Sequence, residues 1–109
     1  MSNIFDDREK QFESQYKHDE ELRFKVGVRR DKLLGQWVAS KLGLKGADAE
    51  AYAKGLIATD IEQPGDDYLV ERIKADFKAR DIDISEHRIR KHLAECDAEA
   101  REQIMKGES

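Results

Sequence analysis

Three histidines and a single cysteine are the side chains of this sequence best suited to binding a metal ion or attacking a substrate. His92 and Cys96 are four residues apart, a spacing that puts them on adjacent turns of one face of a helix. A structural zinc site needs four ligands, and no further pair stands at a spacing that would complete one. Cys96 also falls on an apolar stripe, so we interpret it as a small buried hydrophobic residue. The sequence therefore predicts no metal site and no cofactor.

Other catalytic patterns are equally weak. The chain has no glycine-rich phosphate loop followed by Lys-Ser or Lys-Thr, so we do not expect it to hydrolyse nucleotides. A nucleophilic pair of Cys96 and His92 lacks an evident Asn or Asp to orient the imidazole. Trp37 and Tyr52 lie on apolar stripes and are expected to anchor the core, where such residues use the polar tip for a hydrogen bond. We predict a protein that is not an enzyme.

The net charge of the chain is concentrated near its N-terminus. Hydrophobic residues make up 39% and charged residues 40% of the 109 residues, which fits one small domain with a modest core. Residues 1–21 hold seven acidic and three basic side chains, and this balance of −4 equals the net charge of the whole chain. The densest basic strings, RRDK at 29–32 and RIRKH at 88–92, are interpreted as solvated helix faces. Nucleic acid is not expected as a partner, because phosphate binding requires a clustered basic surface.

The sequence also bears on the cellular compartment. No apolar run is long enough to span a membrane, so membrane insertion is not expected. The first residues are acidic and lack the basic and then apolar pattern of a signal peptide. Cys96 has no second cysteine with which to form an internal disulfide, in keeping with a reducing environment. These observations predict a cytoplasmic protein.

Two amphipathic helices are predicted in the first half of the chain. The first spans residues 22–42 and is expected to end at Gly43, which suits the left-handed residue that closes a helix. The second spans residues 47–62 and stops at the Gln-Pro-Gly sequence 63–65. Their expected apolar stripes comprise Leu22, Val26, Leu33, Leu34, Trp37, Val38 and Leu42 in the first helix, and Tyr52, Leu56, Ile57 and Ile61 in the second.

Two further helices are predicted in the second half. The third begins with Asp66 and Asp67, whose carboxylates are favourable at a helix N-terminus, and ends near Arg80. The fourth begins with Ser85 as N-cap, although Asp83 would fit a capping box one register earlier. The expected core positions are Leu69 or Val70, Ile73 and Phe77 in the third helix, and Ile89, Leu93, Cys96, Ala100 and Ile104 in the fourth.

Together these helices predict an all-α protein, a small four-helix bundle at residues 20–109 with short connections and mostly antiparallel neighbours. Residues 1–19 form a polar N-terminal arm that is partly disordered or helical, since isolated helices of this length are marginal in water. Gly27 lies inside the first helix, where glycine costs about 1 kcal/mol relative to alanine. It marks either a bend between arm and bundle or a place where two helices pack closely.

The arm carries few large apolar side chains. Phe5, Phe12 and Tyr16 fall at i, i+7 and i+11, so a helix would bring them onto one narrow face, with Arg8 and Glu9 beside it. Recognition of a helix by a groove on another protein uses such an arrangement of apolar anchors and charged rim. A solvated extension without a function, and an arm that packs weakly on its own bundle, are equally compatible with this spacing.

Several strings of the sequence resemble one small family, the zeta-type inhibitor subunit of bacterial F-type ATP synthase, long catalogued as a domain of unknown function. These strings are FDDRE at 5–9, KHDEE at 17–21, RRDKLLGQW at 29–37, GADAEAYAK at 46–54, and the acidic Pro-Gly turn before the third helix. The resemblance covers almost the whole chain in the same order. The third and fourth strings are its most specific parts.

The resemblance implies a four-helix inhibitor whose N-terminal segment enters the catalytic head of the ATP synthase, between an alpha and a beta subunit and near the rotating gamma subunit. There it would block rotation in the hydrolysis direction and limit wasteful ATP consumption. Phe5, Phe12 and Tyr16 would be apolar anchors within a charged rim. The expected partner-binding residues are Ile4, Phe5, Asp6, Asp7, Arg8, Glu9, Lys10, Phe12, Glu13, Tyr16 and Lys17.

Two other functions remain open at the level of the sequence. One is a general helical adaptor that binds a different partner. The other is a regulatory sensor that binds a nucleotide weakly in a crevice between bundle and arm, although no residue specifies such a pocket.

Overall fold

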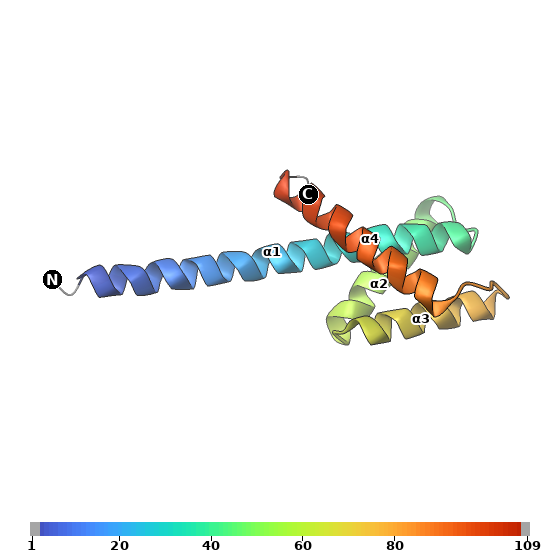
Figure 1. The fold of residues 1–109 in the computed structure, drawn as a ribbon. Helices are drawn as coiled ribbons and strands as arrows, with labels where there is room; N and C mark the ends of the chain where they lie inside the picture. The colour runs from blue at the N-terminus through green and yellow to red at the C-terminus, as the bar shows by residue number, and fades with distance from the viewer. Residues whose placement is uncertain (1–2, 108–109) are drawn as a thin grey trace.

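The computed structural model describes the backbone of residues 3–107 and the side chains of residues 19–107. The described part consists of four α-helices and contains no strand. The helices are α1 (Asn3–Lys41), α2 (Gly46–Glu62), α3 (Asp66–Ala79) and α4 (Glu86–Met105). Successive helices run in opposite directions and are joined by short connections, as Figure 1 shows. The prediction of a small all-α bundle is confirmed.

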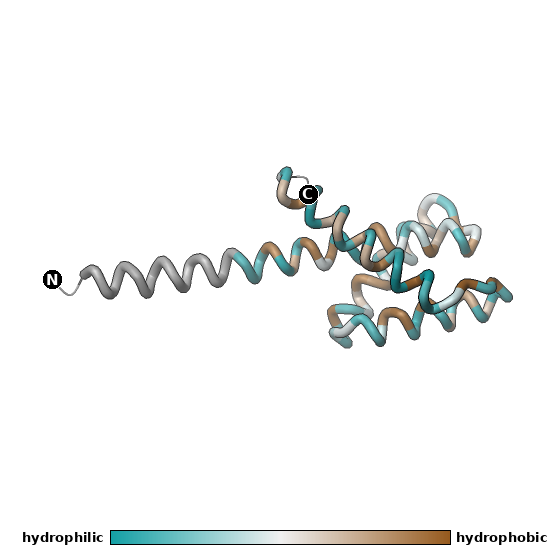
Figure 2. The backbone as a smooth tube through the Cα atoms, viewed as in Figure 1, coloured by the Kyte–Doolittle hydropathy of each residue, from teal (hydrophilic) through white to brown (hydrophobic). Residues whose placement is uncertain are grey.

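The core of the bundle lies where α1 meets α2 and α4, with α3 packed against α2 and α4. Figure 2 shows hydrophobic and hydrophilic positions alternating along α3 and α4, as expected of helices that bury one side. None of the helices in the described residues has both the length and the apolar character needed to cross a membrane. The buried residues of the main cluster are Leu34, Val38, Leu42, Leu56, Leu69, Val70, Ile73, Phe77, Ile89, Leu93 and Cys96.

The helices begin and end at residues whose types predicted these ends from the sequence. Gly43 has a φ of 79°, so it supplies the left-handed residue predicted to close α1. The Ser85 hydroxyl accepts a hydrogen bond from the backbone N–H of Arg88 at 3.1 Å, which confirms Ser85 as the N-cap of α4. Asp66 and Asp67 occupy the first turn of α3, as predicted, and Gly65 is the N-cap.

Two core assignments need correction. Ile61 was placed on the apolar side of α2, but its side chain is 56% exposed. The buried face of α2 centres on Ala53 and Leu56, and five residues beyond Leu56 the helix has turned to about 140° from that face. In α3 the choice between Leu69 and Val70 was unnecessary, because both side chains are fully buried.

The close packing of two helices occurs at Gly35, eight residues after the position considered for it. A Cβ atom added to Gly35 would lie 2.6 Å from the Cα and 2.8 Å from the Cβ of Ala53 in α2. At Gly27 an added Cβ would meet nothing within 4 Å, so the close-packing interpretation of Gly27 is wrong. Helix α1 also continues through Gly27 without a break. Gly35 and Ala53 therefore set the distance between α1 and α2.

The surroundings of Gly35 and Gly27 predict that replacing each glycine by alanine has opposite effects on stability. Gly35→Ala is expected to lower the free energy of unfolding by about 2 kcal/mol, because the added methyl group must push α2 away from α1. Gly27→Ala is expected to raise it by about 0.5–1 kcal/mol, because alanine favours the helix and has room. Urea unfolding of both variants would check this. A Gly35→Ala protein as stable as the wild type would contradict the contact.

Candidate functional site

The residues expected to bind a partner lie at the start of α1. All eleven, from Ile4 to Lys17, fall within residues 1–18, whose side chains are outside the described part of the chain. Their roles as anchors and charged rim therefore stay predictions. The described part of α1 next to them begins at Asp19, and six of the seven residues 19–25 are exposed, with Leu22 half-buried.

The residues considered for metal or nucleophilic chemistry are part of the packing between helices. Cys96 is buried, and burial together with the nearby Glu99 and Glu95 carboxylates raises the pKa of its thiol to about 11. The His92 ring stacks on Trp37, with ring centroids 3.9 Å apart. Among residues 19–107 no group of three or more His, Cys, Asp or Glu residues could hold a metal ion. Cys96 is the small buried residue that the sequence predicted.

Tyr52 anchors α2 to α3 through its polar tip. Its hydroxyl donates a hydrogen bond to Asp76 at 2.6 Å, and the guanidinium of Arg72 lies 5.6 Å from the centre of its ring. Burial and the bond to Asp76 raise the pKa of the Tyr52 hydroxyl. Arg72 also donates to the carbonyl oxygen of Gly55 at 2.6 Å and to the hydroxyl of Thr59. These contacts confirm Tyr52 as a core anchor with a hydrogen-bonded polar end.

A buried charge cluster joins α1 to α2 and α3, at a string that was interpreted as a solvated face. Arg30 contacts the carboxylates of Asp31, Asp60 and Asp66, each at 3.1 Å. Asp31 is only 2% exposed, and the Arg30 side chain is 15% exposed. The solvated interpretation of RRDK is therefore wrong for these two residues. The spacing of Asp31 from Leu34 and Val38, three and seven residues, was the available signal that it faces the core.

The cluster holds three carboxylates and one guanidinium, so full ionisation would leave excess negative charge around a buried group. Burial raises the pKa of the Asp31 carboxyl to about 8, a hydrogen bond with Asp60 adds to the rise, and the charge of Arg30 opposes it. Asp66 is half exposed and remains in contact with water. Asp31 is thus the member of the cluster that takes up a proton.

This cluster predicts a specific dependence of stability on pH. The pKa of Asp31 is raised on folding from 3.8 to about 8, so between these values the folded protein binds the proton more tightly than the unfolded chain. Its contribution to stability is complete below pH about 4 and is lost as pH rises towards about 8, at up to about 1.4 kcal/mol per pH unit. Asp31→Asn should remove this decline. Unfolding by urea at several pH values would measure it, and parallel curves for both proteins would contradict it.

A match to a known protein family shows which proteins the chain is related to. Residues 1–103 match the family described as ATPase inhibitor subunit zeta. The chain belongs to this family. No curated protein matches the chain. The zeta match spans the helical bundle and also the first 19 residues, where the expected partner-binding positions lie.

Membership in the zeta family gives the chain a regulatory role, as an inhibitory subunit that acts on an ATPase. The half-buried His92 and Arg30 and the buried Cys96 belong to the scaffold of such a subunit, because each joins α1 or α4 to its neighbours.

Proposed function

We propose that this protein inhibits ATP hydrolysis by an F-type ATP synthase, with residues 1–19 as the inhibitory arm and residues 20–109 as the bundle that carries it. The family match supports the inhibitory role and includes the whole arm. Binding changes the activity of a motor only if the inhibitor has different affinities for its conformational states. The proposed inhibitor therefore needs a binding surface and no catalytic residues.

The exposure of α1 before the bundle is the observation that carries the proposal. Among the residues whose side chains the structure describes, the main cluster begins at Leu34, so residues 19–33 of α1 contribute no buried member to it. From Asp19 to Lys25 the described side chains are mostly exposed, so this part of the helix is not held by the packing of its own bundle. A helix with so little burial gains stability when a partner covers it.

The finer mechanism concerns where the arm binds. We place it at an interface between an alpha and a beta subunit of the catalytic head, near gamma, where an inserted helix would block rotation in the hydrolysis direction. Phe5, Phe12 and Tyr16 would enter apolar pockets, in the manner of an amphipathic helix in a groove. The charged residues Asp6, Asp7, Arg8, Glu9, Lys10 and Glu13 would contact the rim of that groove.

The function is tested by adding the full-length protein to the isolated catalytic head of the cognate ATP synthase and measuring the rate of ATP hydrolysis. A saturable fall in the rate is expected as the inhibitor concentration rises. A rate that stays unchanged at saturating protein would contradict the proposal. It would then favour a helical adaptor for another partner, or a sensor of nucleotide.

A further inference from the structure

A hollow with an apolar lining lies where α1 leaves the bundle beside the end of α4. Its volume is about 340 Å³, and we call its lining the root surface, made of Leu22, Phe24, Lys25, Val28, Arg29, Ile104 and Gly107. Phe24 is 61% exposed, and Met105, which follows Ile104 in α4, is 75% exposed. The predicted apolar stripe of α1 did not include Phe24, and the structure leaves this residue exposed.

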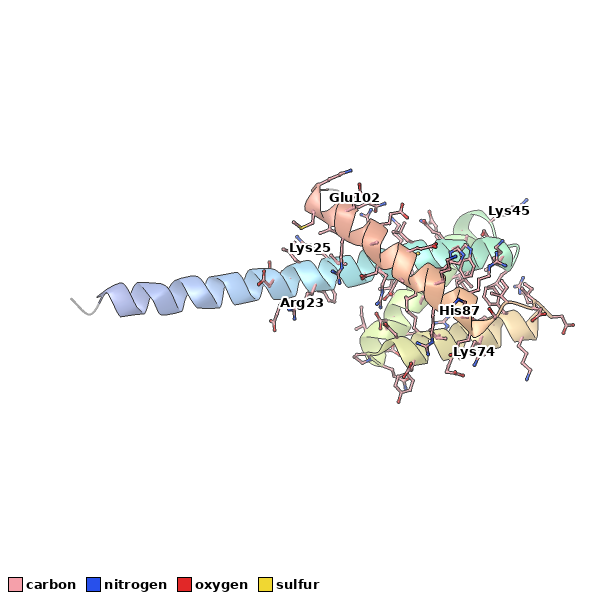
Figure 3. All side chains as sticks on the ribbon, viewed as in Figure 1. Arg23, Lys25, Lys45, Lys74, His87 and Glu102 are labelled. Carbon is pink, nitrogen blue, oxygen red and sulfur yellow. The ribbon has the colours of Figure 1, made fainter. Side chains whose placement is uncertain are left out.

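The described charged side chains of the root surface are all positive. Lys25 and Arg29 line the hollow, and among residues 19–107 no carboxylate does. Arg29 donates a hydrogen bond at 2.7 Å to the side-chain oxygen of Gln103, a neutral amide, and forms no ion pair within residues 19–107. Glu102, the nearby acid at the end of α4, is paired with Lys106 at 2.8 Å. Figure 3 shows Lys25 on the side of α1 that faces α4 and Arg23 on the other side.

The root surface lies close to the arm along α1. Phe24 follows the proposed arm by five residues, which is about 7.5 Å along the axis of a helix. A protein that held the arm would therefore meet the root surface next. Exposed aromatic groups framed by charged residues are typical of protein contact sites, where aromatic side chains contribute much of the binding energy.

We infer that the root surface is a second contact with the ATPase, and that it binds a segment of the partner in which apolar side chains are flanked by carboxylates. This inference rests on the proposed function, since it assigns the occupant to the protein that takes the arm. Phe24 supplies the apolar contact, with Leu22, Val28 and Ile104 as the floor of the hollow. Lys25 and Arg29 pair with the acidic flanks, so the contact weakens as salt screens these charges.

Two pairs of full-length variants test the inference. Phe24→Ala removes the exposed aromatic group, and Tyr68→Ala is its matched control, because Tyr68 is 57% exposed in the first turn of α3. Lys25→Glu reverses a charge in the hollow, and Lys45→Glu reverses an exposed lysine at the opposite end of the bundle, as Figure 3 shows. The half-inhibitory concentration for ATP hydrolysis by the isolated catalytic head is measured at low and high salt, and thermal unfolding checks the fold.

We expect Phe24→Ala to raise the half-inhibitory concentration about tenfold and Lys25→Glu about fivefold at low salt, with both controls unchanged. The effect of Lys25→Glu should shrink at high salt. Wild-type inhibition by both root-surface variants would overturn the inference while leaving the inhibitory function in place. Equal losses in the controls would overturn it as well. If the wild-type protein itself does not inhibit, the proposed function fails and the inference fails with it.

Discussion

A chain that begins at residue 20 is expected to keep the bundle and lose inhibition. The apolar anchors and the charged rim proposed for the arm all lie before that residue. Without them the half-inhibitory concentration for ATP hydrolysis should rise by about hundredfold or more, since several central contacts are lost together. Titration of the isolated catalytic head with the full and shortened chains would measure the ratio.

The bundle should survive this deletion, because the main cluster, as the described side chains form it, lies between Leu34 and Cys96. Thermal unfolding followed by circular dichroism is the control, and the shortened chain should unfold cooperatively at a temperature near that of the full chain. A folded, shortened chain that inhibits as well as the full one would contradict the role of the arm. Inhibition would then come from residues 20–109 and not from the arm.

Replacing Arg30 by methionine is expected to lower the free energy of unfolding by about 3 kcal/mol, because the mostly buried Asp60 carboxylate loses its cationic partner and the buried Asp31 loses a hydrogen-bond donor. Arg30 lies between Asp31, Asp60 and Asp66, and its guanidinium donates hydrogen bonds from α1 to the end of α2 and the start of α3. Chemical unfolding at neutral pH would give the value.

Arg101→Met is the matched control for this prediction. Arg101 also pairs with an aspartate, Asp97, at 3.0 Å, but its side chain is 70% exposed and the pair spans one turn of α4. Exposed pairs of this kind contribute about 0.5 kcal/mol or less. Similar decreases in the free energy of unfolding for Arg30→Met and Arg101→Met would contradict the prediction, because burial would then not strengthen the Arg30 cluster.

Local patterns predicted most of the fold. Helical spacing placed Leu34, Val38, Ile73 and Phe77 correctly on buried faces, and a single serine located the start of α4. These features depend on residues within one or two turns of each other, so the sequence displays them directly. The failure at Ile61 has the same origin, since only the position of the neighbouring helices decides which edge of the α2 stripe is covered.

Features that depend on distant residues could not be predicted. The partners of Arg30 on α2 and α3 are 30 and 36 residues away, and no local pattern indicates them. The contact between Gly35 and Ala53 likewise depends on how two helices cross. Phe24 was missed for a different reason, because an apolar residue away from a core stripe gives no periodic signal. The partner-binding arm remains a prediction from spacing and family resemblance.

Because Trp37 stacks on His92, its fluorescence can be used to follow the contact between α1 and α4 without an added label. Trp37 is the only tryptophan of the chain, and its indole lies between α1 and α4, with Phe77 of α3 at 6.0 Å. Tryptophan fluorescence therefore reports the packing of α1 against α4 and against Phe77 of α3. Tryptophan emission that stays constant when a partner binds would mean that the packing around Trp37 is kept, and a spectral shift would mean that α3 or α4 moves relative to α1.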